Sequence, residues 1–349
     1  MNESKEFVDM YYGKLDKKYW PQHNYCCFLI ESIRSFIYEI KENNLDETEI
    51  TFDIEPENFS DEECCLSFLK NNNMEKEFVS VICKNLFLGL IFDFLEYIDE
   101  VIFNLKIGKI SIAYELMRKP FKENLLYMEL ILFDCNNIAN CIYDEEVNKY
   151  SIGRDGLSRK EIKEIVKFNT INNRMFQKFT NGRISNDEIY NIRYSYDSSN
   201  SLELVWNKAI HLITTSKNIK SKDFNFIYKG IVDWDEHLSY IYGKLPLLLL
   251  YTLGITEKIF ERFFRDIKPE TKFYNDYLLL ENLLESHNKY DSKSPFSNLI
   301  KDRTYFPCTK CNSIIKIDAD KKYYYNYIWT ICPKCNQLID VHKYYFIKK

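Results

Sequence analysis

YFPCTKCNSIIKIDADKKYYYNYIWTICPKCNQLIDVHKYYF, residues 305–346, contains two Cys-x-x-Cys pairs, Cys308/Cys311 and Cys332/Cys335. Twenty residues separate the two pairs, an interval that lets two tight turns approach one tetrahedral metal ion. Two residues between thiolates allow both sulfurs of a pair to bind the same zinc ion at about 2.3 Å. The sequence therefore predicts a structural zinc site with these four cysteines as ligands.

This tail resembles the zinc ribbon family, whose hallmark is a pair of such knuckles, here Cys308-Thr-Lys-Cys311 and Cys332-Pro-Lys-Cys335. The resemblance implies a β ribbon around a structural metal, because a shell of four thiolates leaves no open position for a substrate. Core thiols or disulfides are the alternative interpretation of the four cysteines. His342 lies outside the pattern and is expected to be an ordinary surface residue.

Charge is divided unevenly between the tail and the rest of the chain. Residues 301–349 carry nine lysines and one arginine against four aspartates, a net charge of +6. Residues 1–300 carry 37 basic and 48 acidic side chains, a net charge of −11. Lysines interleaved with aromatic side chains suit phosphate attraction and base stacking. Packing of Tyr324, Tyr327 and Trp329 against the body is the alternative, in which the tail is purely structural.

The rest of the chain predicts helices. Nine glycines and eight prolines in 349 residues provide few turns, which favours long helices. Apolar residues recur at helical steps over 24–42, and Pro120 is expected to kink or restart the helix over 110–142. Other helices are expected at 78–105, 202–215, 236–253 (interrupted at Pro246), 256–266 and 272–287. The fold class expected is mainly α: a multi-helix body with a small C-terminal β zinc ribbon.

The composition also suggests where the domains end. An α-helical body is expected over 1–290, with a polar excursion at about 143–200 that contains a Ser158-x-x-Glu161 capping box and a helix ending near Thr180. The polar composition of residues 291–302 predicts a linker. The ribbon is expected over residues 303–349. Neither a signal segment nor an apolar run of spanning length is seen in the sequence. We therefore expect a cytoplasmic protein without a membrane partner.

Two segments of the body, IAYELMRKPFKENLLYMELIL and LELVWNKAIHLITT, resemble helical proteins of the HEPN ribonuclease type. No arginine precedes a histidine with four to six residues between them, so the family's R-x4-6-H motif is missing. The resemblance therefore implies a related helical architecture only. The candidate catalytic residues are Arg118, Glu123 and His211. A structural ion-pair network around Pro120 and a core role for His211 are the alternatives.

Asp233, Asp235, Glu236 and His237 form the densest group of potential ligands for a hard metal ion. Acidic residues before an apolar helix also suit its N-terminus, and this interpretation is preferred. Glycine-rich nucleotide loops and common hydrolase motifs are absent from the sequence.

These observations favour a noncatalytic nucleic-acid- or protein-binding factor that acts through its basic ribbon. A ribonuclease-like toxin or phage-defence enzyme is the second hypothesis. The oligomeric state stays open.

Overall fold

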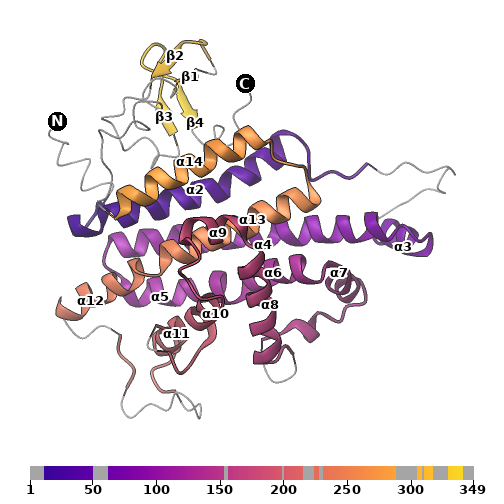
Figure 1. Cartoon of the computed structure of the whole chain (residues 1–349), viewed down its shortest axis with the longest axis horizontal. Coiled ribbons are helices and arrows are strands. Elements are labelled where there is room, and N and C mark those ends of the chain that lie inside the picture. Colours follow the sequence, from indigo (N-terminus) through magenta and orange to yellow (C-terminus); the bar gives the residue numbers. More distant parts are fainter. Residues whose placement is uncertain are drawn as a thin grey trace.

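The computed structural model describes residues 12–49, 62–152, 156–198, 200–214, 224–227, 231–287, 305–308, 310–316 and 329–340. These residues form a mainly α-helical protein, as the sequence predicts. Figure 1 shows the helices in stacked layers, with four short strands in yellow. The predicted linker at 291–302 lies outside the described residues, as do Tyr324 and Tyr327.

Four long helices form the upper layers in Figure 1. They are α2 (Trp20–Glu42), α4 (Glu75–Lys106), α13 (Leu245–Phe263) and α14 (Pro269–Ser286). α2 packs against α4, α13 and α14, so helices from the two ends of the body lie side by side. The helices predicted at 24–42, 78–105 and 272–287 are confirmed within a few residues.

Pro120 interrupts the helix predicted over 110–142. α5 (Ile110–Lys119) is followed by one π-helical turn at Pro120–Asn124 and then by α6 (Leu125–Phe133). Proline has no N–H for the α-helical ladder and its ring needs room, so the wider turn is a natural response. The sequence did not predict a second break at Asp134, where the carboxylate accepts a hydrogen bond from the Asn137 N–H at 3.2 Å and caps α7 (Cys135–Tyr143).

Six shorter helices complete the body. They are α3 (Glu62–Asn71), α8 (Arg159–Asn172), α9 (Arg174–Thr180), α10 (Glu188–Tyr194), α11 (Leu202–Ile210) and α12 (Ile231–Tyr242). The predicted capping box is present: the Glu161 N–H donates to Ser158 Oγ at 3.3 Å, and the Ser158 N–H donates to the Glu161 carboxylate at 2.8 Å. The described part of the polar excursion contains a 3-10 turn at Val147–Tyr150 and the helices α8 to α10.

Several helix boundaries differ from the prediction. The helix expected to run from the capping box to about Thr180 is broken at Asn173, so that α8 ends at Asn172 and α9 continues to Thr180. The helix expected over 202–215 ends at Ile210, because His211 is extended (φ −118°, ψ 120°) and its carbonyl accepts a hydrogen bond from the Asn225 side chain instead. The interruption expected at Pro246 is present, because α12 ends at Tyr242 and α13 begins at Leu245. The break expected between 253 and 256 is absent, since α13 runs from Leu245 to Phe263. Pro246 lies in the first turn of α13, where a missing N–H is not needed.

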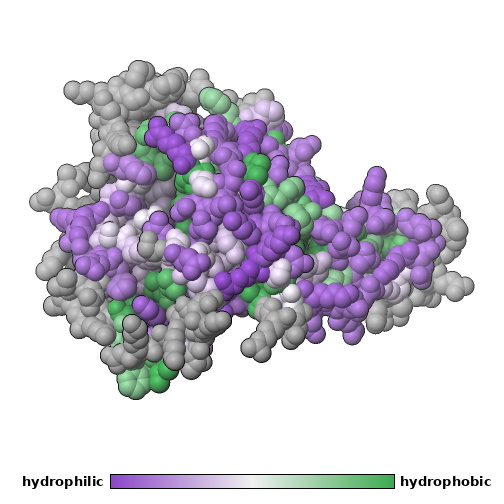
Figure 2. All heavy atoms as spheres, turned by 60° about the horizontal axis from the view of Figure 1, so that its bottom comes forward, coloured by the Kyte–Doolittle hydropathy of each residue, from purple (hydrophilic) through white to green (hydrophobic). Residues whose placement is uncertain are grey.

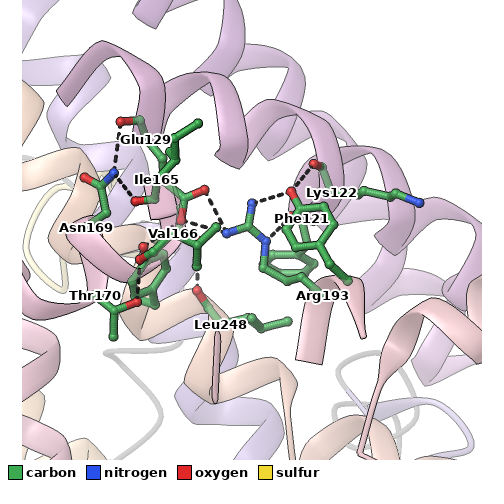
Figure 3. A network of polar contacts seen from close by, with 12 residues as sticks. Phe121, Lys122, Glu129, Ile165, Val166, Asn169, Thr170, Arg193 and Leu248 are labelled. Carbon is green, nitrogen blue, oxygen red and sulfur yellow. Dashed lines mark hydrogen bonds and ion pairs between the residues drawn. The ribbon is translucent and has the colours of Figure 1, made fainter. Parts of the chain in front are cut away.

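One contiguous cluster of buried apolar side chains, from Tyr12 to Leu279, receives residues from every helix α2 to α14. Arg193 and Glu129 form an ion pair within this core (Figure 3). Both side chains are 0% exposed, and one guanidinium nitrogen donates to the two carboxylate oxygens at 2.7 and 2.9 Å. Tyr251 adds a hydroxyl that donates to the same carboxylate at 2.6 Å. The buried charges are therefore paired and hydrogen-bonded, as burial requires.

The same ion pair is tied to the π-helical turn. Arg193 Nε donates to the Phe121 carbonyl at 2.6 Å, and the Tyr194 hydroxyl donates to the Lys122 carbonyl at 2.6 Å. Both carbonyls belong to the π-helical turn, so two side chains of α10 bind the backbone at the point where the regular α-helix is interrupted. Lys122 Nζ in turn lies 2.6 Å from a carboxylate oxygen of Glu203, which attaches α11 to the turn.

Two helical runs, Glu75–Lys106 and Trp234–Phe263, are long and apolar enough to cross a membrane by length and composition. Their most apolar windows are 50% and 67% buried inside the structure, and core helices of folded proteins meet the same criterion. Figure 2 shows a face on which hydrophilic residues predominate and hydrophobic ones form small separate areas. The expectation that no apolar segment reaches spanning length is therefore wrong by this criterion, although half of the first window and two thirds of the second lie inside the structure.

Candidate metal centre

Two short antiparallel hairpins carry the four tail cysteines. β1 (Tyr305–Pro307) pairs with β2 (Ile314–Lys316), and β3 (Trp329–Ile331) pairs with β4 (Leu338–Asp340). Each connection between paired strands contains one Cys-x-x-Cys sequence. Residues 317–328, between the two hairpins, lie outside the described residues.

The two connections have the same backbone design. In the first, the Asn312 N–H donates to the Cys308 carbonyl at 2.9 Å and the Cys308 N–H donates to the Ser313 carbonyl at 2.9 Å. In the second, the Asn336 N–H donates to the Cys332 carbonyl at 2.9 Å, with the matching bond from the Cys332 N–H at 2.8 Å. Asn312 and Asn336 have φ values of 52° and 56°, a left-handed conformation that asparagine tolerates better than most residues. The repeated sequence Cys-x-Lys-Cys-Asn is therefore a repeated turn.

The sulfurs of the two turns converge. Cys308 Sγ lies 3.5 Å from Cys335 Sγ, and Cys311 Sγ lies 3.8 Å from Cys332 Sγ. All four Sγ atoms lie within 4.8 Å of one another. Tetrahedral zinc bonds of about 2.3 Å place two sulfurs about 3.8 Å apart, so the cluster has the dimensions of one four-coordinate metal ion. Among the described residues, these four cysteines are the one group of three or more cysteine, histidine or acidic side chains placed closely enough to hold a metal ion.

Neutral donors surround the sulfurs. The Lys310 N–H donates to Cys308 Sγ at 3.4 Å, and Ser313 Oγ lies 2.9 Å from Cys311 Sγ and 3.3 Å from Cys332 Sγ. Chiefly through Ser313, and also through backbone N–H groups, the pKa of Cys332 is lowered to about 6. A backbone hydrogen bond from Gln337 acts in the same direction on Cys335, but desolvation and the three neighbouring cysteines together outweigh it and raise that pKa to about 12. Four crowded thiols therefore resist losing all their protons unless a cation joins them.

This donor set fits a metal ion that prefers sulfur and tetrahedral geometry. The sulfurs are close enough to reach one ion, Cys308 and Cys332 are 0% exposed, and the surrounding donors point at sulfur rather than at a fifth ligand. Sulfur ligands in this arrangement select zinc or iron over magnesium or calcium. The four residues that the sequence predicts as ligands are thus brought together.

The candidate catalytic residues lie elsewhere, in the helical body. Arg118 and Glu123 form an ion pair of 3.2 Å across the π-helical turn, and both side chains are partly exposed. Lys119 pairs with Asp93 at 2.8 Å, so the charges around Pro120 form the kind of network that the sequence allows for. His211 does not lie in a helix interior as expected, because it follows the last residue of α11 and is exposed. In the described part of the chain, no hydrogen bond joins His211 to Arg118 or Glu123, which bond to each other. A catalytic role for the three residues stays a prediction.

The acidic group near residue 235 lies within α12, and among the described residues it forms no cluster of metal-ligand dimensions. α12 begins at Ile231, so Asp233 falls in its first turn, as the helix N-terminus prediction allows, whereas Asp235, Glu236 and His237 lie beyond that turn. Asp235 pairs with Lys18 at 2.6 Å and accepts a hydrogen bond from the Tyr19 hydroxyl at 2.9 Å. His237 bridges the Tyr114 hydroxyl and the Ile227 carbonyl. These side chains attach α12 to the N-terminal segment and to α5.

Sequence reasoning missed the buried Arg193–Glu129 pair and the hydroxyl of Ser313. Glu129 is a lone charge in the apolar run LLYMELILF, which signals a buried acid in need of a partner. Its partner lies 64 residues away in a polar segment, and no local pattern identifies it. Ser313 follows its knuckle closely enough to be suspected of contacting sulfur.

Comparison with known proteins returns no family model, no curated protein and no solved structure that matches this chain.

Proposed function

We propose that the four cysteines bind one zinc ion, that this ion organises the C-terminal segment as a zinc ribbon, and that the ribbon is a noncatalytic module that binds nucleic acid. The convergence of four sulfurs within 4.8 Å of one another carries the proposal. Four thiolates fill the coordination shell of zinc, so the ion has a structural role and provides no site for a substrate.

Charge at matched positions supports nucleic acid as the partner. Lys310 and Lys334 occupy the same position in the two knuckles, each directly before the second cysteine, and both are exposed. The tail carries a net charge of +6, which falls to about +4 once four thiolates and a zinc ion are counted. Exposed lysines on a positively charged module attract phosphate through a long-range field, whereas the acidic body repels it. An acidic protein surface would use the same lysines and is the competing partner.

The compartment proposed is the cytoplasm. None of the ten cysteines described in the structure forms a disulfide with another of them, the four of the cluster included. A reducing environment keeps such thiols available for a metal, whereas an oxidising one favours disulfides.

Elemental analysis of the purified full chain tests the metal. We expect one zinc per chain and less than one tenth of that in Cys308→Ser, because three thiolates hold zinc far less tightly. Cys65→Ser removes a cysteine outside the cluster and is the matched control, which should keep its zinc. Iron in place of zinc, or no metal in the wild type, would refute this part.

Binding of the zinc-loaded chain to single-stranded RNA and DNA across a salt series tests the partner. We expect Lys310→Gln/Lys334→Gln to weaken binding about tenfold and to reduce its salt dependence by about two phosphate contacts. Lys160→Gln is the control, since that side chain is 87% exposed on α8. Equal, negligible binding by all three proteins would exclude nucleic acid and leave an acidic protein as the partner to test.

A further inference from the structure

Ion pairs attach α14 to two neighbouring helices of the body. Lys272 of α14 lies 2.6 Å from a carboxylate oxygen of Glu261 on α13. One turn later on α14, the Asp276 carboxylate lies 2.5 Å from Lys178 Nζ and 3.7 Å from Arg174 Nη2, both on α9. In Figure 1, α14 is the uppermost long helix and lies along α2, so it has neighbours on one side only.

The position of α9 determines which part of α13 lies beside Asp276. The Asn173 side chain, at the start of α9, donates to the Tyr251 carbonyl at 2.9 Å, and α9 packs on α13. The two cations that hold Asp276 therefore belong to a helix fixed beside the middle of α13. Asp276 is thus brought to the middle of α13, whereas Lys272 lies beside Glu261, near the end of that helix.

Glu257 lies on the side of α13 that faces Asp276. It precedes Glu261 by four residues, and residues at this spacing share one face of a helix. Since Lys272 of α14 meets Glu261, the residue one turn later on α14, Asp276, approaches the residue one turn earlier on α13, Glu257. Two carboxyl groups from different helices therefore face each other, and like charges at such a contact repel.

Glu257 is the carboxyl group of this cluster that lacks a cation of its own. In the part of the chain that the structure describes it forms no ion pair, because Glu261 pairs with Lys272 and Asp276 with the cations of α9. Burial raises the pKa of Glu257 to about 7. Lys272 and Arg174 lower that pKa, whereas Glu261 and Asp276 raise it further.

We propose that Glu257 is a pH sensor for the attachment of α14. In its neutral form the carboxyl group is compatible with burial and with the nearby Asp276 and Glu261 carboxylates, so α14 stays packed on its neighbours. In its ionised form it adds a third negative charge to the contact, and α14 detaches more often. Protonation of one group thus biases a helix between two positions, and this regulation is independent of the zinc site.

The direction of the effect follows from the protons bound in each state. When α14 detaches, water reaches Glu257 and its pKa returns toward the ordinary value of 4.5. Between pH 4.5 and 7 the attached state therefore binds a proton that the detached state does not. The contribution of Glu257 to attachment is complete below pH 4.5 and is lost as the pH rises through 7.

A metal ion between the two facing carboxyl groups is the competing interpretation. It is disfavoured because, among the described residues, no third cysteine, histidine or acidic side chain lies within metal-ligand distance of Glu257 and Asp276. Two basic side chains also occupy the Asp276 carboxylate already.

Hydrogen exchange of the full chain with mass spectrometry at pH 5 and pH 7, corrected for the intrinsic pH dependence of exchange, tests the proposal. We expect protection of α14 to fall at least about tenfold over this range, while protection of α4 does not fall. Glu257→Gln keeps the size of the side chain without its charge, so α14 of this variant should keep its protection at pH 7. Glu164→Gln on α8, where the side chain is 60% exposed, is the matched control and should behave as the wild type.

Three outcomes would overturn the proposal. Protection of α14 that is the same at both pH values in the wild type would show that no titrating group controls it, and this result does not depend on the folding of a variant. An unchanged decline in Glu257→Gln would assign the effect to another group. An equal decline in α4 would show that the whole body responds to pH rather than α14.

Discussion

The helical body and the cysteine tail bury ionisable groups in opposite ways. In the body, Arg193 and Glu129 are both 0% exposed and neutralise each other. The Tyr251 hydroxyl donates to the carboxylate, and the Phe121 carbonyl accepts from the guanidinium. In the tail, four thiols of the same kind converge, and the donors near them are backbone N–H groups and a hydroxyl, which carry no net charge. A region with a large core can supply its own counter-charge, whereas a small one depends on an external cation.

The largest expected effect is the response of the tail to metal removal. Binding of zinc by four cysteines contributes about 10–16 kcal/mol to folding of a small module. We expect a chelator to abolish amide protection in residues 305–340 while α2, α4 and α13 keep theirs. Hydrogen exchange with mass spectrometry measures both regions in one experiment. Equal loss of protection in the long helices would show that the two regions are not independent.

Breaking the ion pair in the core should have the next largest effect. Arg193→Met leaves the Glu129 carboxylate buried without its partner, which costs about 3–5 kcal/mol of unfolding free energy. Arg193→Met/Glu129→Leu removes both charges and should cost less than the sum of the two single variants. Urea denaturation of the four proteins gives this coupling. Additive costs would mean that the two charges do not stabilise each other.

A third way to bury an ionisable group is to keep it neutral, and His23 is the example. Its side chain is 1% exposed, its Nδ1 lies 2.9 Å from the Tyr242 hydroxyl, and burial, with a smaller effect of Lys106, lowers its pKa to about 3. The unfolded chain binds this proton below about pH 6.5 but the folded chain does not, so stability falls as the pH drops from 6.5 toward 3.

At about 1.4 kcal/mol per pH unit, His23 should cost about 3 kcal/mol of unfolding free energy by pH 4. His23→Asn can still hydrogen-bond to Tyr242 but does not titrate, so its stability should decline less steeply on acidification. Urea denaturation between pH 7 and pH 4 compares the two proteins. Parallel curves would show that His23 is protonated in the folded state.

The sequence predicted what local patterns determine. Apolar periodicity located α2 and α4, Pro120 located the π-helical turn, and Cys-x-x-Cys spacing located the sulfur cluster. Pro246 also indicated the interruption between α12 and α13, within a few residues. The end of α11 at Ile210 was misplaced, because it depends on the contact that Asn225 makes with the His211 carbonyl across the loop. The partner of Glu129 could not be predicted for the same reason: pairing of distant residues is a property of the packed core.

The smallest expected effect concerns Ser313, which tests whether neutral donors around the sulfurs stabilise the metal-bound state. Its hydroxyl has one proton and lies 2.9 Å from Cys311 Sγ and 3.3 Å from Cys332 Sγ, so it can donate to one sulfur at a time. Loss of such an outer partner typically weakens metal affinity 10- to 100-fold. Since the backbone N–H donors remain, we expect about tenfold for Ser313→Ala.

Ser313→Thr keeps the hydroxyl and is the matched control, which should retain most of the affinity. Competition with a chelator of known zinc affinity measures all three proteins. Equal affinity of Ser313→Ala and wild type would show that backbone amides alone offset the thiolate charge. In the tail, the negative charge of the thiolates would then be neutralised by the cation and the backbone amides, without help from a side chain. In the body, by contrast, the buried Glu129 carboxylate depends on side-chain donors from other helices.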